Sequence, residues 1–289
     1  MAREQTTTIG TELLALLERV AKYLNAPNAS KPKKVHATRK SLKRARALLR
    51  LARPALRKEA YARTNRRLRD IGRSVSPLRD ARASVDILAS VRQRMDKKSV
   101  VRELAPLARN LRMTLAQRQA RSEHRRVAKR AASALVPVIR QLRFLFGQLS
   151  TATVIDKGLR RIYRRGRRAL DMARSKQSPL NLHELRKQAK YLRNAIDGES
   201  IPVRHPRDAK KFNILADWLG EYHDLDVLLT IADRDKTPLK DNARKSLVAA
   251  IKRREDKLQR RSLRLAKRLF ARKPRTFVAH TSVRARHPR

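Results

Sequence analysis

The sequence predicts an all-α protein. Only 7 Gly and 12 Pro interrupt its 289 residues, and much of the rest is Ala, Leu, Arg and Lys, which favour helices. Apolar residues recur three and four positions apart, as they do along one face of an α-helix. No segment joins the alternating pattern of a β-strand to a tight hairpin turn. A substantial β-sheet is therefore not expected.

In the first half, helix boundaries are expected at Pro residues. Leu13, Leu16 and Leu17 begin an apolar stripe at helical spacing. Ser30 fits an N-cap for the second helix, which Pro54 should end. The helices expected in this half cover residues 9–24, 32–53, 55–75, 77–95 and 99–146, with breaks or kinks at Pro106 and Pro137.

The second half follows a linker at residues 147–153. Ser178 and Pro179 begin a helix, and a loop is expected over residues 198–206. From Arg272 the sequence is basic with little apolar periodicity, which predicts a mobile tail. The helices expected in this half cover residues 154–173, 179–196, 208–221, 225–233 and 238–270.

The net charge of +49 restricts the function. Self-repulsion of this size destabilises a compact state, which suggests a polyanion as the usual partner: nucleic acid, an anionic membrane or inorganic polyphosphate. The alternative is that the positive charges are simply hydrated and have no anionic partner. The chain has no Cys, no apolar run long enough to span a membrane and no export signal at its N-terminus. The cytoplasm is the default location.

Acidic residues are absent from three long segments. Residues 30–58 hold twelve Lys or Arg, residues 157–168 hold seven, and residues 257–289 hold twelve, with no Asp or Glu in any of them. A solvated helix face usually mixes both signs of charge and gains from the resulting pairs. The unmixed runs favour a bound anion over a plain hydrated surface.

A motif with histidine and basic residues occurs twice. Residues 35–46 are VHATRKSLKRAR and residues 182–193 are LHELRKQAKYLR, so five polar positions are identical at an offset of 147 residues. This predicts an internal duplication. Projected on a helix, each copy has an apolar face and an opposite cationic stripe. The first stripe is His36, Arg39, Lys40, Lys43, Arg46 and Arg50, and the second is His183, Arg186, Lys187, Lys190 and Arg193.

The stripes suit an extended phosphate chain. His36 and Arg50 lie about 21 Å apart along one helix, and Arg offers forked donors that match phosphate oxygens. We expect the two stripes to face each other and hold one chain. Neighbouring cations disfavour protonation of His36 and His183, so both imidazoles should be neutral near pH 7 in the free protein.

A second pair of similar segments supports the duplication. Residues 78–80 match the last residues of the segment 215–224. Aligning Asp80 with Asp224 gives an offset of 144 and places Arg79 opposite His223. These acids either anchor basic side chains of the stripes or cap the following helix.

The order and duplication of these motifs resemble the CHAD (conserved histidine α-helical) domain family over essentially the whole chain. The resemblance implies two helical bundles related by a pseudo-twofold axis around a basic cavity, here residues 1–150 and 151–271, with a basic tail at 272–289. It also implies polyphosphate binding and association with polyphosphate granules. The first half has Arg79 at the position that His223 occupies in the second half. This difference indicates that the two halves contribute unequally to binding. By the same resemblance, the binding surface comprises both stripes, His223, Arg160, Arg161, Arg164, Arg165 and Arg168.

Other functions have weaker support in the sequence. It has no phosphate-binding Gly-rich loop, no HExxH pair and no metal-ligand spacing among its His residues, so we expect neither an enzyme nor a cofactor. The Glu-x-Glu-x-Lys signature of the triphosphatase-like domain often fused to this family is also absent. Non-sequence-specific nucleic-acid binding is the main alternative to polyphosphate binding. Only 11 residues are Phe, Trp or Tyr, which argues against the base stacking that single-strand binding uses. Membrane association ranks third, and no oligomeric state is indicated.

Overall fold

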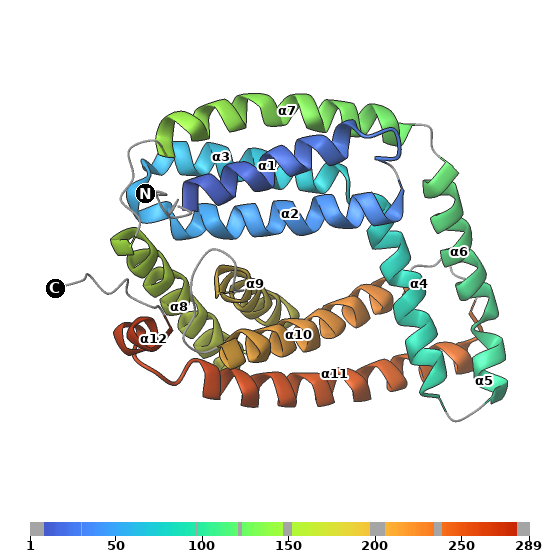
Figure 1. Ribbon diagram of the computed structural model, residues 1–289. Coiled ribbons are helices and arrows are strands. Elements are labelled where there is room, and N and C mark those ends of the chain that lie inside the picture. The colour runs from blue at the N-terminus through green and yellow to red at the C-terminus, as the bar shows by residue number, and fades with distance from the viewer. Residues whose placement is uncertain are drawn as a thin grey trace.

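The computed structural model describes residues 9–29, 31–95, 98–120, 123–146, 152–196, 206–233 and 239–281. Every regular element within these ranges is a helix, which confirms the all-α class (Figure 1). The first helices are α1 (Ile9–Asn25), α2 (Pro32–Leu51), the 3₁₀-helix η1 (Arg53–Ala55), α3 (Lys58–Ser74), α4 (Pro77–Gln93), α5 (Lys98–Glu103), α6 (Ala105–Ala120) and α7 (Glu123–Phe146). The later ones are α8 (Ala152–Ser175), α9 (Pro179–Ile196), α10 (Pro206–Ala232), α11 (Asp241–Leu269) and α12 (Pro274–Thr281).

The first four-helix group consists of α1, α2, α3 and α7. Helix α1 packs on α2 and α7, and α3 packs on the same two helices. Each helix turns an apolar face inward, and Leu13, Leu48, Leu68 and Leu135 are completely buried there. Burying one Leu side chain contributes about 1.5–3 kcal/mol, so this shared core is what holds the cationic α2 in place.

The second group consists of α8, α9, α10 and α11. Helix α9 packs between α8 and α10, while α11 packs on α10 and α8. Leu185, Leu215 and Leu247 are completely buried in this core. In Figure 1 the group lies below the first one, with α11 along the outer edge.

The two groups meet in two places. Helix α2 packs directly on α8 and α9, and α4, which belongs to neither group, packs on both α2 and α10. Gly158 of α8 lies against the backbone of Leu51, where any Cβ would overlap the Leu51 carbonyl oxygen. A glycine is required for this close approach.

Three details differ from the sequence expectation. The helix expected to break between residues 221 and 225 is the continuous α10, in which Leu219, Leu225 and Leu228 are buried on both sides of the expected break. The N-cap of α2 is Lys31, and Ser30, the expected N-cap, lies outside the described residues. Helix α7 continues through Pro137 without a break.

The prediction of a mobile tail from Arg272 is wrong for residues 274–281. They form α12, in which Phe277 is 1% exposed and stacks on Tyr163 with ring centroids 3.9 Å apart. The Tyr163 hydroxyl donates a hydrogen bond of 2.9 Å to the Leu269 carbonyl. Two aromatic rings therefore fix a segment whose composition gave no helical signal. Residues 282–289, the rest of the expected tail, lie outside the described residues.

Candidate functional site

A pocket of about 530 Å³ lies between α2, α3 and α9. Its walls therefore come from both helix groups. None of the described residues that line it is acidic, whereas seven are Lys or Arg. The lining consists of Arg39, Leu42, Lys43, Arg46, Arg50, Asn65, Leu68, Arg69, Gly72, Arg73, Ser76, His183, Lys187 and Tyr191.

Helix α2 presents cations to the pocket because its other face is buried. Ala45, Leu48 and Leu49 are each 0% exposed and pack in the core of the first helix group. With 3.6 residues per turn, burying this face turns Lys43 and Arg46 away from it and toward α9. The expected division of the helix into apolar and cationic faces is present.

Two arginines of the pocket are held by hydrogen bonds. The Arg46 Nε donates to Asn65 Oδ1 over 3.1 Å, which ties α2 to α3. The Arg50 guanidinium donates to the Tyr191 hydroxyl over 2.9 Å and to the Arg46 carbonyl over 3.1 Å. It also lies over the Tyr191 ring, with Cζ 3.7 Å from the centroid. Both cations are therefore oriented before any ligand arrives.

The arrangement disfavours the positive charge of Arg46. Burial lowers its pKa, and the nearby Arg50 charge lowers it further. An anion in the pocket would offset both effects, since it supplies the opposite charge beside a partly desolvated guanidinium.

His183 and His223 come together at one side of the site. Their ring centroids lie 4.7 Å apart, with α9 supplying one ring and α10 the other. Burial, and after it the neighbouring His223, Arg186 and Lys187, lower the pKa of His183 to about 4. Burial and then Arg186 also lower the pKa of His223. His183 is therefore neutral near pH 7, as expected, although burial outweighs the neighbouring cations as the cause.

The pocket contains only part of the predicted binding surface. Six predicted residues line it, and they come from both stripes: Arg39, Lys43, Arg46, Arg50, His183 and Lys187. Part of each stripe thus borders the same pocket. His36 and Lys40 are exposed on α2 outside the lining, and Arg186, Lys190 and Arg193 are half-buried on α9. Arg193 donates to Asn213 over 2.7 Å.

The five predicted arginines of α8 lie outside the pocket lining. Arg160 is half-buried, and the other four, Arg161, Arg164, Arg165 and Arg168, are exposed. Partial burial lowers the pKa of Arg161, and Arg53 and Arg165 lower it further. This cationic cluster lies on α8, next to η1.

Sequence reasoning missed the wall that α3 provides. Asn65, Arg69 and Arg73 follow one another at intervals of four residues and line the pocket. The same spacing argument that found the stripe on α2 would have found them. Tyr191 was also missed, and only its position between Lys190 and Arg193 hinted at a role.

The first of the two predicted acids lies beside a stripe. An Arg39 nitrogen lies 4.0 Å from Asp80 Oδ1. The N-cap position of α4 is Ser76, so Asp80 does not cap that helix. Of the two roles expected for Asp80, anchoring a basic side chain of a stripe therefore fits better than capping a helix. The side chain of Arg79 lies outside the described residues.

The described ranges contain neither a candidate metal site nor a candidate membrane span. No three His, Asp or Glu side chains there gather in a group that could hold a metal ion. No described helix is both long enough and apolar enough to cross a membrane.

Comparison with known proteins identifies the family. A model of the CHAD domain matches residues 12–232. The chain belongs to the CHAD domain family. The crystal structure of the CHAD domain from the plant Ricinus communis matches this CHAD domain with a TM-score of 0.53 over 94% of both chains, at 15% sequence identity. That likeness concerns the fold alone, and no curated protein matches the chain.

The pocket lies entirely within the matched part of this CHAD domain. Helices α2, α3 and α9 all fall between residues 12 and 232, whereas α11 and α12 follow that segment. The predicted pseudo-twofold duplication and the division at residues 150 and 271 stay predictions.

Proposed function

We propose that this CHAD domain binds inorganic polyphosphate in the pocket between α2, α3 and α9, and that it acts by binding rather than by turnover. The observation that carries the proposal is the lining itself: cations from both helix groups and no carboxylate among the described lining residues. The CHAD family in general binds polyphosphate. On this proposal the protein associates with polyphosphate granules in the cytoplasm.

The chemistry of the walls suits a chain of phosphates. Lys43 and Arg46 on α2 lie across the pocket from Lys187 on α9, so a linear anion between them is contacted from both sides. Arg offers a planar fork of donors to phosphate oxygens, whereas Lys acts as a mobile point charge. Since Arg46 and Arg50 are already oriented, less conformational entropy is lost when the anion binds.

Nucleic acid is the alternative ligand, because its backbone carries the same charged group. A base needs a free aromatic face or a splayed-out strand. Tyr191 is the one Phe, Tyr or Trp among the described lining residues, and the Arg50 guanidinium covers its ring. The phosphates of a duplex flank a wide cylinder, which fits a recess between helices poorly. The pocket therefore favours polyphosphate.

A competition titration at about 150 mM salt tests the proposal, because weak long-range attraction is largely screened there. Labelled long-chain polyphosphate would be displaced by duplex DNA, RNA or short oligophosphates. The pocket variant carries Lys43→Ala, Arg69→Ala, Arg73→Ala and Lys187→Ala. The charge-matched control carries Arg125→Ala, Arg126→Ala, Lys129→Ala and Arg130→Ala, four exposed cations of α7.

We expect polyphosphate to bind the wild type more than tenfold more tightly than the competitors do. The pocket variant should lose this preference, and the α7 control should keep it. Equal competition by DNA or RNA, with equal weakening by both variants, would show a general polyanion binder and contradict the proposal.

A further inference from the structure

Helix α11 carries a further row of cations, outside the pocket lining. Between residues 257 and 268 six of twelve residues are Lys or Arg, with no acid among them. All six are exposed, and in the described ranges none of them has an acidic partner. They are Lys257, Arg260, Arg261, Arg264, Lys267 and Arg268, and we call them the α11 row.

The row lies on one face of a firmly packed helix. At about 100° per residue its members fall within roughly 120° of one another. Ile251, Leu258 and Ala266 are at most 1% exposed on the opposite face, against α10 and α8. The row is thus a fixed feature of a folded helix of 29 residues.

The row belongs to neither the pocket nor the matched CHAD segment. No α11 residue lines the pocket, and α11 begins after residue 232. Figure 1 shows α11 along the edge of the molecule, on the far side of α10 from α2. A ligand that occupies the pocket therefore leaves the α11 row free.

We propose that the α11 row is a second polyanion surface, whose partner is the phosphate backbone of duplex nucleic acid. The row extends over about 16 Å, which corresponds to about ten phosphate charges along a duplex. A straight, convex row of side chains contacts successive phosphates on the outside of a double helix without enclosing them. The surface therefore acts without base recognition.

Other partners fit the row less well. Residues 241–269 contain no Phe, Tyr or Trp, so the helix cannot stack the bases of a single strand. The exposed large hydrophobic residues of the described chain lie on other helices, so α11 lacks the apolar side that an interfacial membrane helix inserts. The phosphates of polyphosphate share the chemistry of a duplex backbone, and the experiment separates the two.

The test compares the pocket variant and the α7 control with an α11 variant that carries Lys257→Ala, Arg260→Ala, Arg264→Ala and Lys267→Ala. Each protein is titrated with a labelled 20-base-pair DNA duplex of random sequence and, separately, with long-chain polyphosphate. The salt dependence is measured for both ligands. Sedimentation with vesicles containing anionic lipid is a third arm.

We expect the α11 variant to bind the duplex at least tenfold more weakly and with a smaller salt slope, by about three to four if each removed cation contacts one phosphate. Its affinity for polyphosphate should stay within threefold of the wild type. The pocket variant should show the reverse pattern. The two results are independent, so failure of this proposal does not touch the pocket proposal.

Three results would overturn the inference. One is equal loss of duplex binding in the α11 variant and the α7 control. Another is a duplex affinity that the α11 variant leaves unchanged, whether or not vesicle binding is lost. The third is loss of polyphosphate binding in the α11 variant to the same degree as loss of duplex binding. A second variant with Gln at the same four positions, checked by circular dichroism, separates a lost contact from a damaged helix.

Discussion

Arg50 of α2 lies over the ring of Tyr191 of α9, with Cζ 3.7 Å from the ring centroid, and donates a hydrogen bond to its hydroxyl. The two residues are 141 positions apart in the sequence. One contact thus connects the two helix groups and forms part of the pocket wall. Ligand binding and association of the groups share this contact.

Changes at Tyr191 should separate its two interactions. Tyr191→Phe removes the hydroxyl but keeps the ring under the guanidinium, so we expect a loss of about 1 kcal/mol of stability. Tyr191→Ala also removes the cation–π contact and apolar burial, and we expect a total loss of about 2–3 kcal/mol. Urea unfolding of the three proteins measures both steps. Equal stabilities of the Phe and Ala variants would contradict the contribution of the ring.

Stability should fall as the pH is lowered from about 7 toward 4, in part through His183. Its pKa is about 4 in the folded protein and 6.5 ordinarily, so below about 6.5 the unfolded state binds the proton more readily. The ring is partly exposed, and after a discount for solvent screening we expect an effect on the order of 1 kcal/mol. Unfolding curves at several pH values, for wild type and His183→Gln, measure it as their difference. Parallel curves would exclude His183 as the source.

Bound polyphosphate should favour the protonated form of His183, which the free folded protein disfavours. An anion beside His183 favours the imidazolium, so its pKa rises on binding and affinity for polyphosphate should increase as the pH falls from 7 to 5. Glu184, Arg186, Lys187 and His223 also act on the His183 charge. Titrations at each pH with wild type and His183→Gln isolate its share. A wild-type profile as flat as that of the variant would contradict the linkage.

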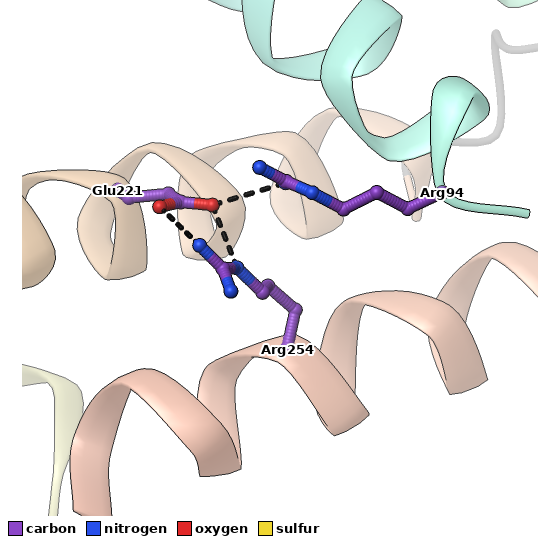
Figure 2. A network of polar contacts seen from close by, with 3 residues as sticks. All are labelled: Arg94, Glu221 and Arg254. Atoms are coloured by element: carbon purple, nitrogen blue, oxygen red, sulfur yellow. Dashed lines mark hydrogen bonds and ion pairs between the residues drawn. The ribbon is translucent and has the colours of Figure 1, made fainter. Parts of the chain in front are cut away.

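Glu221 of α10 joins three helices in one network (Figure 2). Arg254 of α11 donates to both carboxylate oxygens over 2.8 and 2.7 Å, and Arg94 at the end of α4 donates over 3.1 Å. These hydrogen bonds lower the pKa of Glu221, the one with Arg254 most. The carboxylate therefore connects α4, from the first half of the chain, to the second helix group.

Glu221→Gln should cost about 1–3 kcal/mol of stability, because charge-assisted hydrogen bonds are lost beside two arginines. The Arg254 side chain is 23% exposed and the Arg94 side chain 48%, so the pair with Arg254 should be the stronger. Double-mutant cycles with Arg254→Ala and Arg94→Ala measure each coupling. A larger coupling to Arg94 would contradict this order.

Features that depend on the residue spacing within one helix could be predicted from the sequence. The faces of α2 and α9 follow from spacing alone, and Lys43 and Lys187 of the two predicted stripes both line the pocket. Contacts between helices that are distant in sequence produce no such periodic pattern. Nothing local indicates that α3 forms the third wall, that the Arg186 guanidinium lies beside Gly220 of α10, or that Tyr163 stacks on Phe277 of α12.

Two glycines should respond to alanine in opposite ways. A Cβ at Gly158 would overlap the Leu51 backbone, so Gly158→Ala must push α8 away from α2. We expect a loss of more than about 2 kcal/mol and, because α2 and α9 form the pocket together, a weaker affinity for polyphosphate. A Cβ at Gly72 in α3 meets only Leu42 Cδ1, at 3.9 Å, so Gly72→Ala should stabilise the helix by up to about 1 kcal/mol. Thermal unfolding and polyphosphate titration of both variants test the pair. A Gly158→Ala protein as stable as wild type would show that the close contact between α8 and α2 is not required.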